Sequence, residues 1–385
     1  MRPAKVLVTG ATGFIGSRLC ELLSLEYRIP YRALVRDYSR AARIARLDPE
    51  LAGGDMSDPG SLARAVEGCD AVVNLAHGDD QGARKQTMQL VEACTRAGVR
   101  RLVHVSSMAV HGPAPGTEVL TEANAPVRRW GEAYSDAKAA AEAVVAAAGR
   151  RGAIETVVLR PTIVYGPYSF FVTPIVQDAR NGFVSLVDGG SGICNAVYVD
   201  DVCEAILAAL ERDDANGGAF LINGDDRMTW RGFITTFAGM VEGEKRIFDH
   251  TLEQIEAHRR ATTPRARDSV AAAVRLAASP AFHAQLATIP PVGRMIRGTK
   301  ELLSGAIGPE RKLMIKSRFQ GRRFAAPVDV APSPRMPSEG RVVREAYRCW
   351  VSNGLAKSRL GWAPAHPFAL GAQRTADWMR FARLI

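Results

Sequence analysis

A glycine-rich turn near the start of the chain limits the folds that this sequence can adopt. The apolar run Val6–Val8 is typical of a buried strand, and the amphipathic segment 17–23 is typical of a helix. Between them stand Gly10, Gly13 and Gly16. The first glycine permits a tight turn, the second lets the backbone approach a pyrophosphate, and the third lets the helix pack close to the strand. Strand, turn and helix together predict a dinucleotide site at a helix N-terminus.

The second predicted strand, residues 31–36, carries the signal for the adenosine end of the cofactor. An acidic residue at the end of this strand binds a ribose 2′-hydroxyl, whereas an arginine accommodates a 2′-phosphate. Arg36 closes the strand here and Asp37 follows it, with Arg40 and Arg43 nearby. We therefore expect NADP, and keep NAD as the alternative because an acidic residue stands one position further on.

Further positions complete the predicted cofactor site. Asp55 is suited to hydrogen-bond an adenine amino group, and Ser57 or Asp58 is suited to cap the helix that follows. The run 71–77 is predicted as another strand, whose end points to the crevice where open α/β sheets bind ligands. The other predicted cofactor contacts are Thr12, Phe14, Ile15, Met56, Leu75, Ala76, His77 and Pro161.

The composition indicates a globular protein without membrane spans or a disulfide framework. In 385 residues no run of eighteen apolar residues occurs, and the first strand begins almost at the N-terminus, which leaves no room for a signal peptide. The six cysteines are scattered without a C-x-x-C pair, and no histidines show metal-ligand spacing. We expect a cytoplasmic protein with reduced thiols and no metal site.

A tyrosine and a lysine stand four residues apart at the start of an alanine-rich predicted helix. Tyr134 and Lys138 therefore lie on one helix face. Free tyrosine has a pKa of about 10 and is a poor base at neutral pH, but a lysine ammonium one turn away, together with a positive nicotinamide, favours the phenolate. The predicted strand that precedes this helix ends in two serines, Ser106 and Ser107.

The order of these motifs carries a family resemblance. The chain contains, in sequence, TGATGFIG, NLAH, VSS, Tyr134-x-x-x-Lys138, LRPTIVYGP at 159–167, VYVDDVCEAI at 197–206 and AKSRLGW at 356–362. It resembles the extended short-chain dehydrogenase/reductase family, the NAD-dependent epimerases and dehydratases that act largely on nucleotide sugars. The resemblance implies a Rossmann-type, doubly wound parallel α/β sheet in residues 1–165. It also implies a smaller C-terminal substrate-binding region in residues 166–385, interleaved with the core.

The resemblance also implies a Ser-Tyr-Lys catalytic site. Tyr134 would exchange a proton with the substrate oxygen as hydride moves to or from the cofactor, and Lys138 would also hold the nicotinamide ribose. Alignment of segment 107–112 with the corresponding strand end in the family assigns Ser107, rather than Ser106, to the substrate oxygen.

Departures from the family pattern bear on the reaction. Related dehydratases and decarboxylases carry an acid directly after the catalytic hydroxyl residue, where this chain has Met108 and Ala109, so neither reaction is expected. Family members acting on nucleotide sugars usually place an arginine where this chain has Cys194, followed by Asn195, to which we assign a substrate contact.

Three functions follow from these observations. We expect an NAD(P)-dependent epimerase or oxidoreductase that acts on a secondary alcohol or ketone of a nucleotide sugar or related polyol. The first alternative is a dehydrogenase or ketoreductase of a hydrophobic alcohol, sterol-like or flavonoid-like. The second, of a different class, is a non-catalytic NAD(P)-sensing protein.

A basic, proline-punctuated segment at about 244–348 separates the core from its closing signature and holds most of the net charge of +10. It is interpreted as a substrate cap, as an oligomer or partner surface, or as a peripheral contact with an anionic membrane. Nucleic acid is not expected as a partner, because no recognised binding motif accompanies the charge. The family resemblance also implies a homodimer, paired through helices like the one that carries Tyr134.

Overall fold

The computed structural model of the chain describes residues 2–77, 80–113, 118–262 and 336–385. It divides into two compact units, one of Met1–Leu252 with Pro334–Ile385 and the other of Glu253–Ser333. The described part of the second unit is helical, since α9 (Leu252–Thr262) runs through it.

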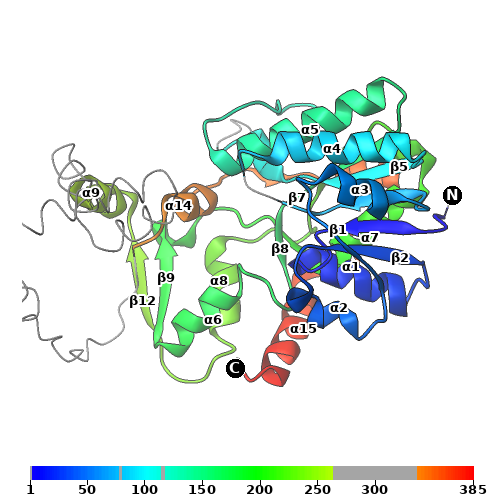
Figure 1. Cartoon of the computed structure of the whole chain (residues 1–385). Coiled ribbons are helices and arrows are strands. Elements are labelled where there is room, and N and C mark those ends of the chain that lie inside the picture. The colour runs from blue at the N-terminus through cyan, green and yellow to red at the C-terminus, as the bar shows by residue number, and fades with distance from the viewer. Residues whose placement is uncertain (1, 78–79, 114–117, 263–335) are drawn as a thin grey trace, which may run out of the picture. The chain divides into compact units, whose positions relative to one another are not determined.

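A seven-stranded parallel sheet forms the centre of the first unit (Figure 1). Its strands are, in spatial order, β11 (Ala219–Ile222), β7 (Glu155–Pro161), β5 (Arg101–Val105), β4 (Ala71–Asn74), β1 (Val6–Thr9), β2 (Tyr31–Val35) and β3 (Glu50–Gly53). The strand order reverses between β1 and β4, and ligands of open α/β sheets bind at such a point, beyond the carboxyl ends of the strands. The predicted doubly wound Rossmann-type sheet is confirmed.

Helices cover both faces of this sheet because its strands are apolar on both sides (Figure 1). Along β1, Val6 and Val8 join the hydrophobic cluster under one face, whereas Leu7 joins the cluster under the other. The first face is covered by α1 (Phe14–Leu25), α2 (Ala42–Ala45) and α7 (Val199–Glu211). The second face is covered by α3 (Pro59–Val66), α4 (Ala83–Arg96) and α5 (Ala133–Arg150).

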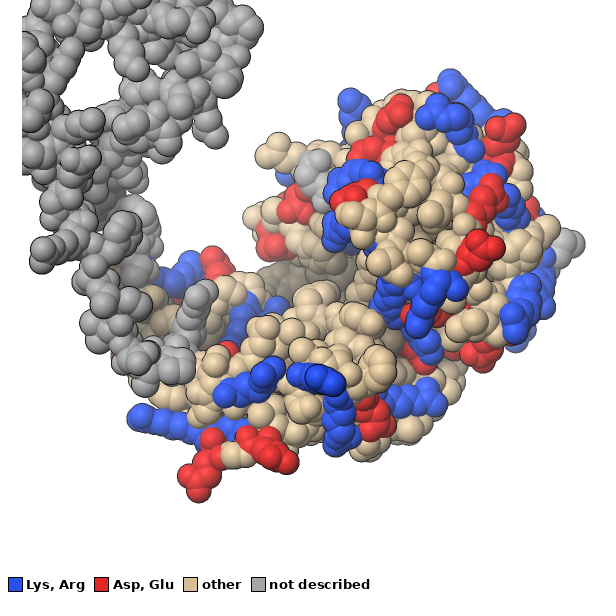
Figure 2. All heavy atoms as spheres, turned by 60° about the horizontal axis from the view of Figure 1, so that its bottom comes forward, with Lys and Arg blue, Asp and Glu red and all other residues tan. Residues whose placement is uncertain are grey.

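A smaller lobe lies beyond the carboxyl ends of the strands (Figure 1). Two parallel pairs build it, β8 with β10 and β9 with β12. Figure 2 shows the surface hollowed between this lobe and the sheet, with mainly uncharged side chains in the hollow. The elements of the lobe are β8 (Ile163–Tyr165), α6 (Thr173–Arg180), β9 (Phe183–Val187), β10 (Ala196–Tyr198), α8 (Trp230–Ala238), β12 (Arg246–His250) and α15 (Phe368–Phe381).

The last part of the basic segment and the chain that follows it are bound firmly into this lobe. In α14 (Glu339–Glu345), Arg341 Nη2 donates to the Ser185 carbonyl of β9 at 2.6 Å. The short strand β13 (Trp350–Val351) then pairs with β6 (Val119–Leu120), in the segment between Ser107 and α5. The C-terminal part of the chain therefore pairs with the segment that follows Ser107, the predicted catalytic serine.

One sequence prediction about this part of the chain is corrected, and another concerns residues that the structure does not describe. The strand predicted at 71–77 ends at Asn74, because the next two amides bond to Thr9: Leu75 N to its carbonyl and Ala76 N to its hydroxyl, both at 3.3 Å. Most of the basic segment 244–348, and with it the predicted membrane contact, lies outside the described residues. No helix within the described ranges is long and apolar enough to cross a membrane.

Candidate active site

The glycine turn has the geometry that a dinucleotide needs. Gly10 has φ +67°, and a Cβ atom on it would come within 2.7 Å of the Leu75 backbone. A Cβ atom on Gly16 would overlap the Gly10 carbonyl, so α1 can pack this close to the turn only with glycine there. Gly13 is exposed at the N-terminus of α1, where free amide groups favour phosphate. The predicted roles of Gly10 and Gly16 match these contacts.

The other predicted cofactor positions lie around this turn or along the same edge of the sheet. Thr12, Phe14 and Ile15 are partly buried in the turn and the first turn of α1. Leu75 and Ala76 lie against Gly10. Met56 packs partly buried against the cluster under α3, and Pro161 is the last residue of β7.

At the adenosine end, an arginine rather than an acid is left available at the end of β2. Arg36 directly follows the strand and is exposed, with Nη1 3.6 Å from Asp55 Oδ2. Asp37 is engaged elsewhere, because its Oδ1 accepts hydrogen bonds from both the amide and the hydroxyl of Ser39. The helix cap predicted at Ser57 or Asp58 is Asp58, which accepts from the Gly60 amide.

The predicted serine and tyrosine meet at the end of β5. Ser107 caps a short 3₁₀ turn, Met108–His111, and accepts a hydrogen bond from Ala109 N at 3.2 Å. Its side chain is also hydrogen-bonded to Tyr134 in the first turn of α5. Burial raises the pKa of Tyr134, the Ser107 hydroxyl lowers it, and the carboxylates of Glu132 and Asp80 raise it further.

The predicted lysine lies one helical turn beyond the tyrosine and is buried. Lys138 Nζ donates to the Val105 carbonyl at 3.0 Å, at the end of β5. Burial lowers the pKa of Lys138 to about 8, so the ammonium is still the main form at neutral pH. The cation is thus fixed beside the strand end that leads to Ser107.

A buried polar network supports this site and was not predicted from the sequence. Ser106 Oγ donates to Glu142 Oε2 at 2.9 Å, and Glu142 forms an ion pair with Arg160 of β7. Arg160 also reaches His111 Nε2 at 3.3 Å, and burial lowers the pKa of His111 to about 4. The position of Glu142, one turn beyond Lys138 on the same helix face, was the only sequence signal for it.

The predicted substrate contact Asn195 is buried and already bonded. Its Nδ2 donates to the Cys349 carbonyl at 2.9 Å, and its Oδ1 accepts from the Val351 amide at 2.8 Å. These bonds fasten β13 to the lobe. Cys194, beside it, is also fully buried. A substrate contact of Asn195 stays a prediction, and its described contacts are structural.

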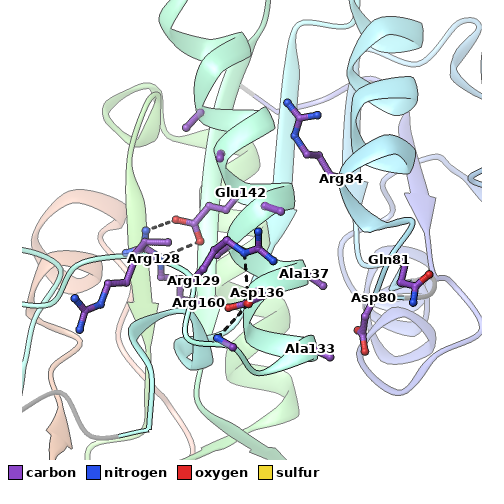
Figure 3. Close-up of a pocket in the computed structure, with 16 residues that line it drawn as sticks. Asp80, Gln81, Arg84, Arg128, Arg129, Ala133, Asp136, Ala137, Glu142 and Arg160 are labelled. Carbon is purple, nitrogen blue, oxygen red and sulfur yellow. Dashed lines mark hydrogen bonds and ion pairs between the residues drawn. The ribbon is translucent and has the colours of Figure 1, made fainter.

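A cavity of about 980 Å³ lies against the outer face of α5 (Figure 3). It is lined by small side chains of that helix, among them Ala137, Ala140 and Ala143, and by Arg84 and Asp80 across from them. The lining does not include Ser107, Tyr134 or Lys138. This cavity is therefore not formed by the three predicted catalytic residues.

The sequence of the chain matches a known protein family. The model of the NAD dependent epimerase/dehydratase family matches residues 6–222, more than half of the chain. The chain belongs to this family. Its members are NAD(P)-dependent epimerases, dehydratases and reductases, so the cofactor is a nicotinamide dinucleotide.

Three relatives illustrate the breadth of the family. The chain is 30% identical over 241 residues to a 4-hydroxy-2-methyl-3-oxo-4-farnesyl-3,4-dihydroquinoline-1-oxide ketoreductase of Stigmatella aurantiaca, covering 60% of this chain and 71% of that one. It is 27% identical over 243 residues to a 2-alkyl-3-oxoalkanoate reductase of Shewanella oneidensis, covering 58% and 62%, so less than two thirds of that relative is matched. A dTDP-glucose 4,6-dehydratase of Streptomyces venezuelae, solved with NAD, shares the fold with a TM-score of 0.66 at 21% identity, covering 100% and 98%.

The residues present fit this cofactor. Gly10 has a positive φ with no room for a Cβ atom, and Gly13 leaves the N-terminus of α1 exposed without a side chain. Arg36 stands at the position that approaches the adenosine ribose. The predicted catalytic residue Ser107 lies just beyond the end of β5, on the same edge of the sheet.

Proposed function

We propose that the protein transfers hydride between NAD(P) and a ketone or secondary alcohol, with Ser107, Tyr134 and Lys138 as catalytic residues. The hydrogen bond between Ser107 and Tyr134 supports this function most directly. It brings the two hydroxyl groups together, and we propose that a single substrate oxygen bonds to both. A non-catalytic sensor would have no use for this arrangement.

Each residue has a distinct task in this reaction. Ser107 holds the substrate oxygen by a hydrogen bond, and Tyr134 gives that oxygen a proton in reduction or removes it in oxidation. The Lys138 ammonium favours the phenolate that remains after the proton has left. When bound, the nicotinamide supplies or accepts the hydride. The burial of Lys138 keeps its charge poorly screened and therefore effective.

We propose reduction or oxidation without elimination. Met108 and Ala109, directly after Ser107, carry no group that transfers a proton. Met108 packs against the buried cluster that contains Leu120, Tyr347 and Val351, so no polar atom enters the site from this side chain. Dehydration or decarboxylation next to the ketone is therefore disfavoured.

For the substrate, we propose a ketone or alcohol with a large apolar part. The two relatives with the most similar sequences reported above are, by name, a ketoreductase of a farnesylated quinoline and a reductase of alkylated oxoalkanoates. In this chain, the segment that follows β8 presents Phe170, whose side chain is 66% exposed, stacked on Phe171. Exposed aromatic rings of this kind are suited to an apolar ligand.

Epimerisation of a nucleotide sugar is the second candidate, and Arg344 favours it. This side chain lies against Phe171 and Trp230, and its buried Nε has no hydrogen-bond partner within the described residues. Its nearest carboxylate, Glu345, is 3.9 Å away and bonds Arg341 more closely. A guanidinium so placed is suited to a diphosphate.

We further propose NADP as the preferred cofactor and a homodimer as the assembled form. Arg36 is exposed at the end of β2, while Asp37 is bonded to Ser39 and so is less available to a ribose. The outer face of α5 offers small side chains, such as Ala140 and Ala143, over which a second copy can pack closely (Figure 3).

One assay separates the two candidate reactions. The protein is incubated with NADPH or NADH and either 2-alkyl-3-oxoalkanoates and steroid ketones or UDP- and dTDP-sugars, with cofactor absorbance and product mass recorded together. A reductase oxidises the cofactor in proportion to product, whereas an epimerase forms product without net cofactor consumption. Failure to turn over any member of either set would count against both candidates.

A further inference from the structure

A histidine that follows β4 packs against the catalytic tyrosine. The rings of His77 and Tyr134 lie edge to face, with centroids 5.1 Å apart and planes at 71°. His77 belongs to the segment after β4, whereas Tyr134 begins α5, so the contact joins two separate elements of the site. Any charge on the imidazole is therefore close to the phenolic ring.

The histidine is paired with a carboxylate. His77 Nε2 lies 3.1 Å from Asp80 Oδ1, and the two side chains are 34% and 39% exposed. The Asp80 charge also reaches the tyrosine, because it is among the groups that raise the pKa of Tyr134. Asp80 borders the cavity along α5, so solvent and protons have access to the pair.

The described charged and titratable groups that face Tyr134 come from three elements. The N-cap of its own helix contributes Glu132, the end of β5 contributes the hydroxyl of Ser107, and the segment before α4 contributes His77 and Asp80. Glu132 is committed to capping α5, since its carboxylate accepts from the amides of Tyr134 and Ser135. Histidine is the side chain that ordinarily changes charge between pH 5 and 8.

We propose that His77 and Asp80 form a positioning pair for Tyr134, which holds the phenol ring toward Ser107 and sets the pH range in which Tyr134 transfers its proton. The proposal rests on the proposed catalytic role of Tyr134 and adds a regulation of that site. With His77 protonated, the pair carries no net charge. With His77 neutral, the Asp80 carboxylate is left uncompensated beside the phenol and opposes the phenolate.

Three variants separate charge from packing. His77→Phe keeps a ring against Tyr134 and removes the partner of Asp80, Asp80→Asn removes the carboxylate, and the double variant removes both. All are expected to fold, because both side chains are well exposed. Asp377→Asn on α15, which removes an equally simple carboxylate from an exposed ion pair, serves as the matched control.

The ionisation of Tyr134 itself is the readout. We would follow the ¹³Cζ signals of the eight tyrosines by NMR across pH, with saturating NADP⁺ and in a parallel series with NAD⁺. The signal absent from Tyr134→Phe identifies the residue. We expect Asp80→Asn to lower the pH at which Tyr134 ionises by about 0.5–1 unit. His77→Phe should change it by less than about 0.2 unit, because a histidine is already neutral at the pH where a tyrosine ionises. The double variant should match Asp80→Asn, and Asp377→Asn should match the wild type.

A shift of less than about 0.2 unit in Asp80→Asn, or a shift of this variant to higher pH, would overturn the pairing. A purely structural contact would give the first of these results. The two levels of inference fail separately. If Tyr134→Phe abolishes turnover while the titrations do not move, the catalytic role stands and the pair has no part in it. If the titrations move but Tyr134→Phe keeps full turnover, the catalytic role is wrong.

Discussion

Arg160 on β7 and Glu142 on α5 form an ion pair that is buried from both sides, with each side chain 7% exposed. Arg160 Nε lies 3.2 Å from Glu142 Oε2, which also accepts a hydrogen bond from Ser106 Oγ. The pair therefore joins the helix that carries the catalytic tyrosine and lysine to the strand end that leads to Ser107.

Removal of one partner of this pair should destabilise the protein strongly. Glu142→Ala leaves the Arg160 guanidinium buried without its carboxylate, and we expect a loss of about 3–5 kcal/mol in the free energy of unfolding. The double variant Glu142→Ala/Arg160→Met leaves no buried charge and should be less destabilised than the single one. Urea unfolding of the three proteins measures this, and a single variant as stable as the wild type would contradict the burial argument.

Tyr134→Phe should lower kcat by about 10²–10⁴-fold, the range typical of a lost general acid or base. The fold and the nucleotide turn are untouched, so the Kd for NADPH should stay near the wild-type value. Steady-state kinetics on the substrate found by the assay above, with a fluorescence titration of NADPH, measure both quantities. Full turnover in this variant would exclude proton transfer by Tyr134.

Lys138→Met should abolish activity and yet stabilise the protein at neutral pH. The folded chain binds the lysine proton up to about pH 8, whereas the unfolded chain binds it up to 10.5. Between these values the unfolded state holds more protons, so the wild-type free energy of unfolding rises with pH. The variant lacks this rise, and its advantage of about 1–3 kcal/mol below pH 8 should shrink toward pH 10.

Urea unfolding of both proteins without cofactor at pH 7 and pH 9.5 tests the expectation for Lys138. A variant that is less stable than the wild type at pH 7 would mean that the hydrogen bond from Lys138 to the Val105 carbonyl outweighs the cost of burying the charge.

Arg36→Ala should weaken NADPH binding by about 10–100-fold, the amount expected for a lost charge-assisted hydrogen bond, and leave NADH binding nearly unchanged. Arg96→Ala, which removes an exposed arginine of α4, is the control. Fluorescence titration with both nucleotides measures the ratio. An unchanged preference would remove the argument for a 2′-phosphate contact at this position.

Ala143→Arg should convert the proposed homodimer into a monomer, because a long charged side chain on the outer face of α5 prevents close helix packing. Ala45→Arg, at an exposed position of α2 on the opposite face of the sheet, should leave the dimer intact. Light scattering after size-exclusion chromatography gives the mass of each. A wild-type protein that is already monomeric would refute the dimer itself.

Local sequence patterns predicted the parts of this fold whose causes are local. The turn Gly10–Gly16, the helix begun by Tyr134 and the parallel strands follow from glycine geometry and apolar runs within a few residues. Strand ends were predicted less well: the strand at 71–77 stops at Asn74, because Thr9, far away in the sequence, takes the next two amides.

Contacts between distant segments were beyond such patterns. Asn195 carries polar groups that are suited to bind a ligand. Its side-chain amide is instead bonded to backbone groups of Cys349 and Val351, more than 150 positions later. The ion pair of Glu142 and Arg160 could not be predicted either, because no local sequence pattern indicates that an acid on a helix contacts an arginine on a strand. The contact of His77 with Tyr134 belongs to the same class.

Two contacts with β9 lie before and after residues 263–335, and they affect how this part of the chain can change. The chain leaves the lobe at β12, which pairs with β9, and re-enters it at Arg341, which bonds to Ser185 of that same strand. Both contacts are therefore with the same strand, β9, and neither involves Ser107, Tyr134 or Lys138. A change in the length of the chain between these two contacts therefore need not move Ser107, Tyr134 or Lys138.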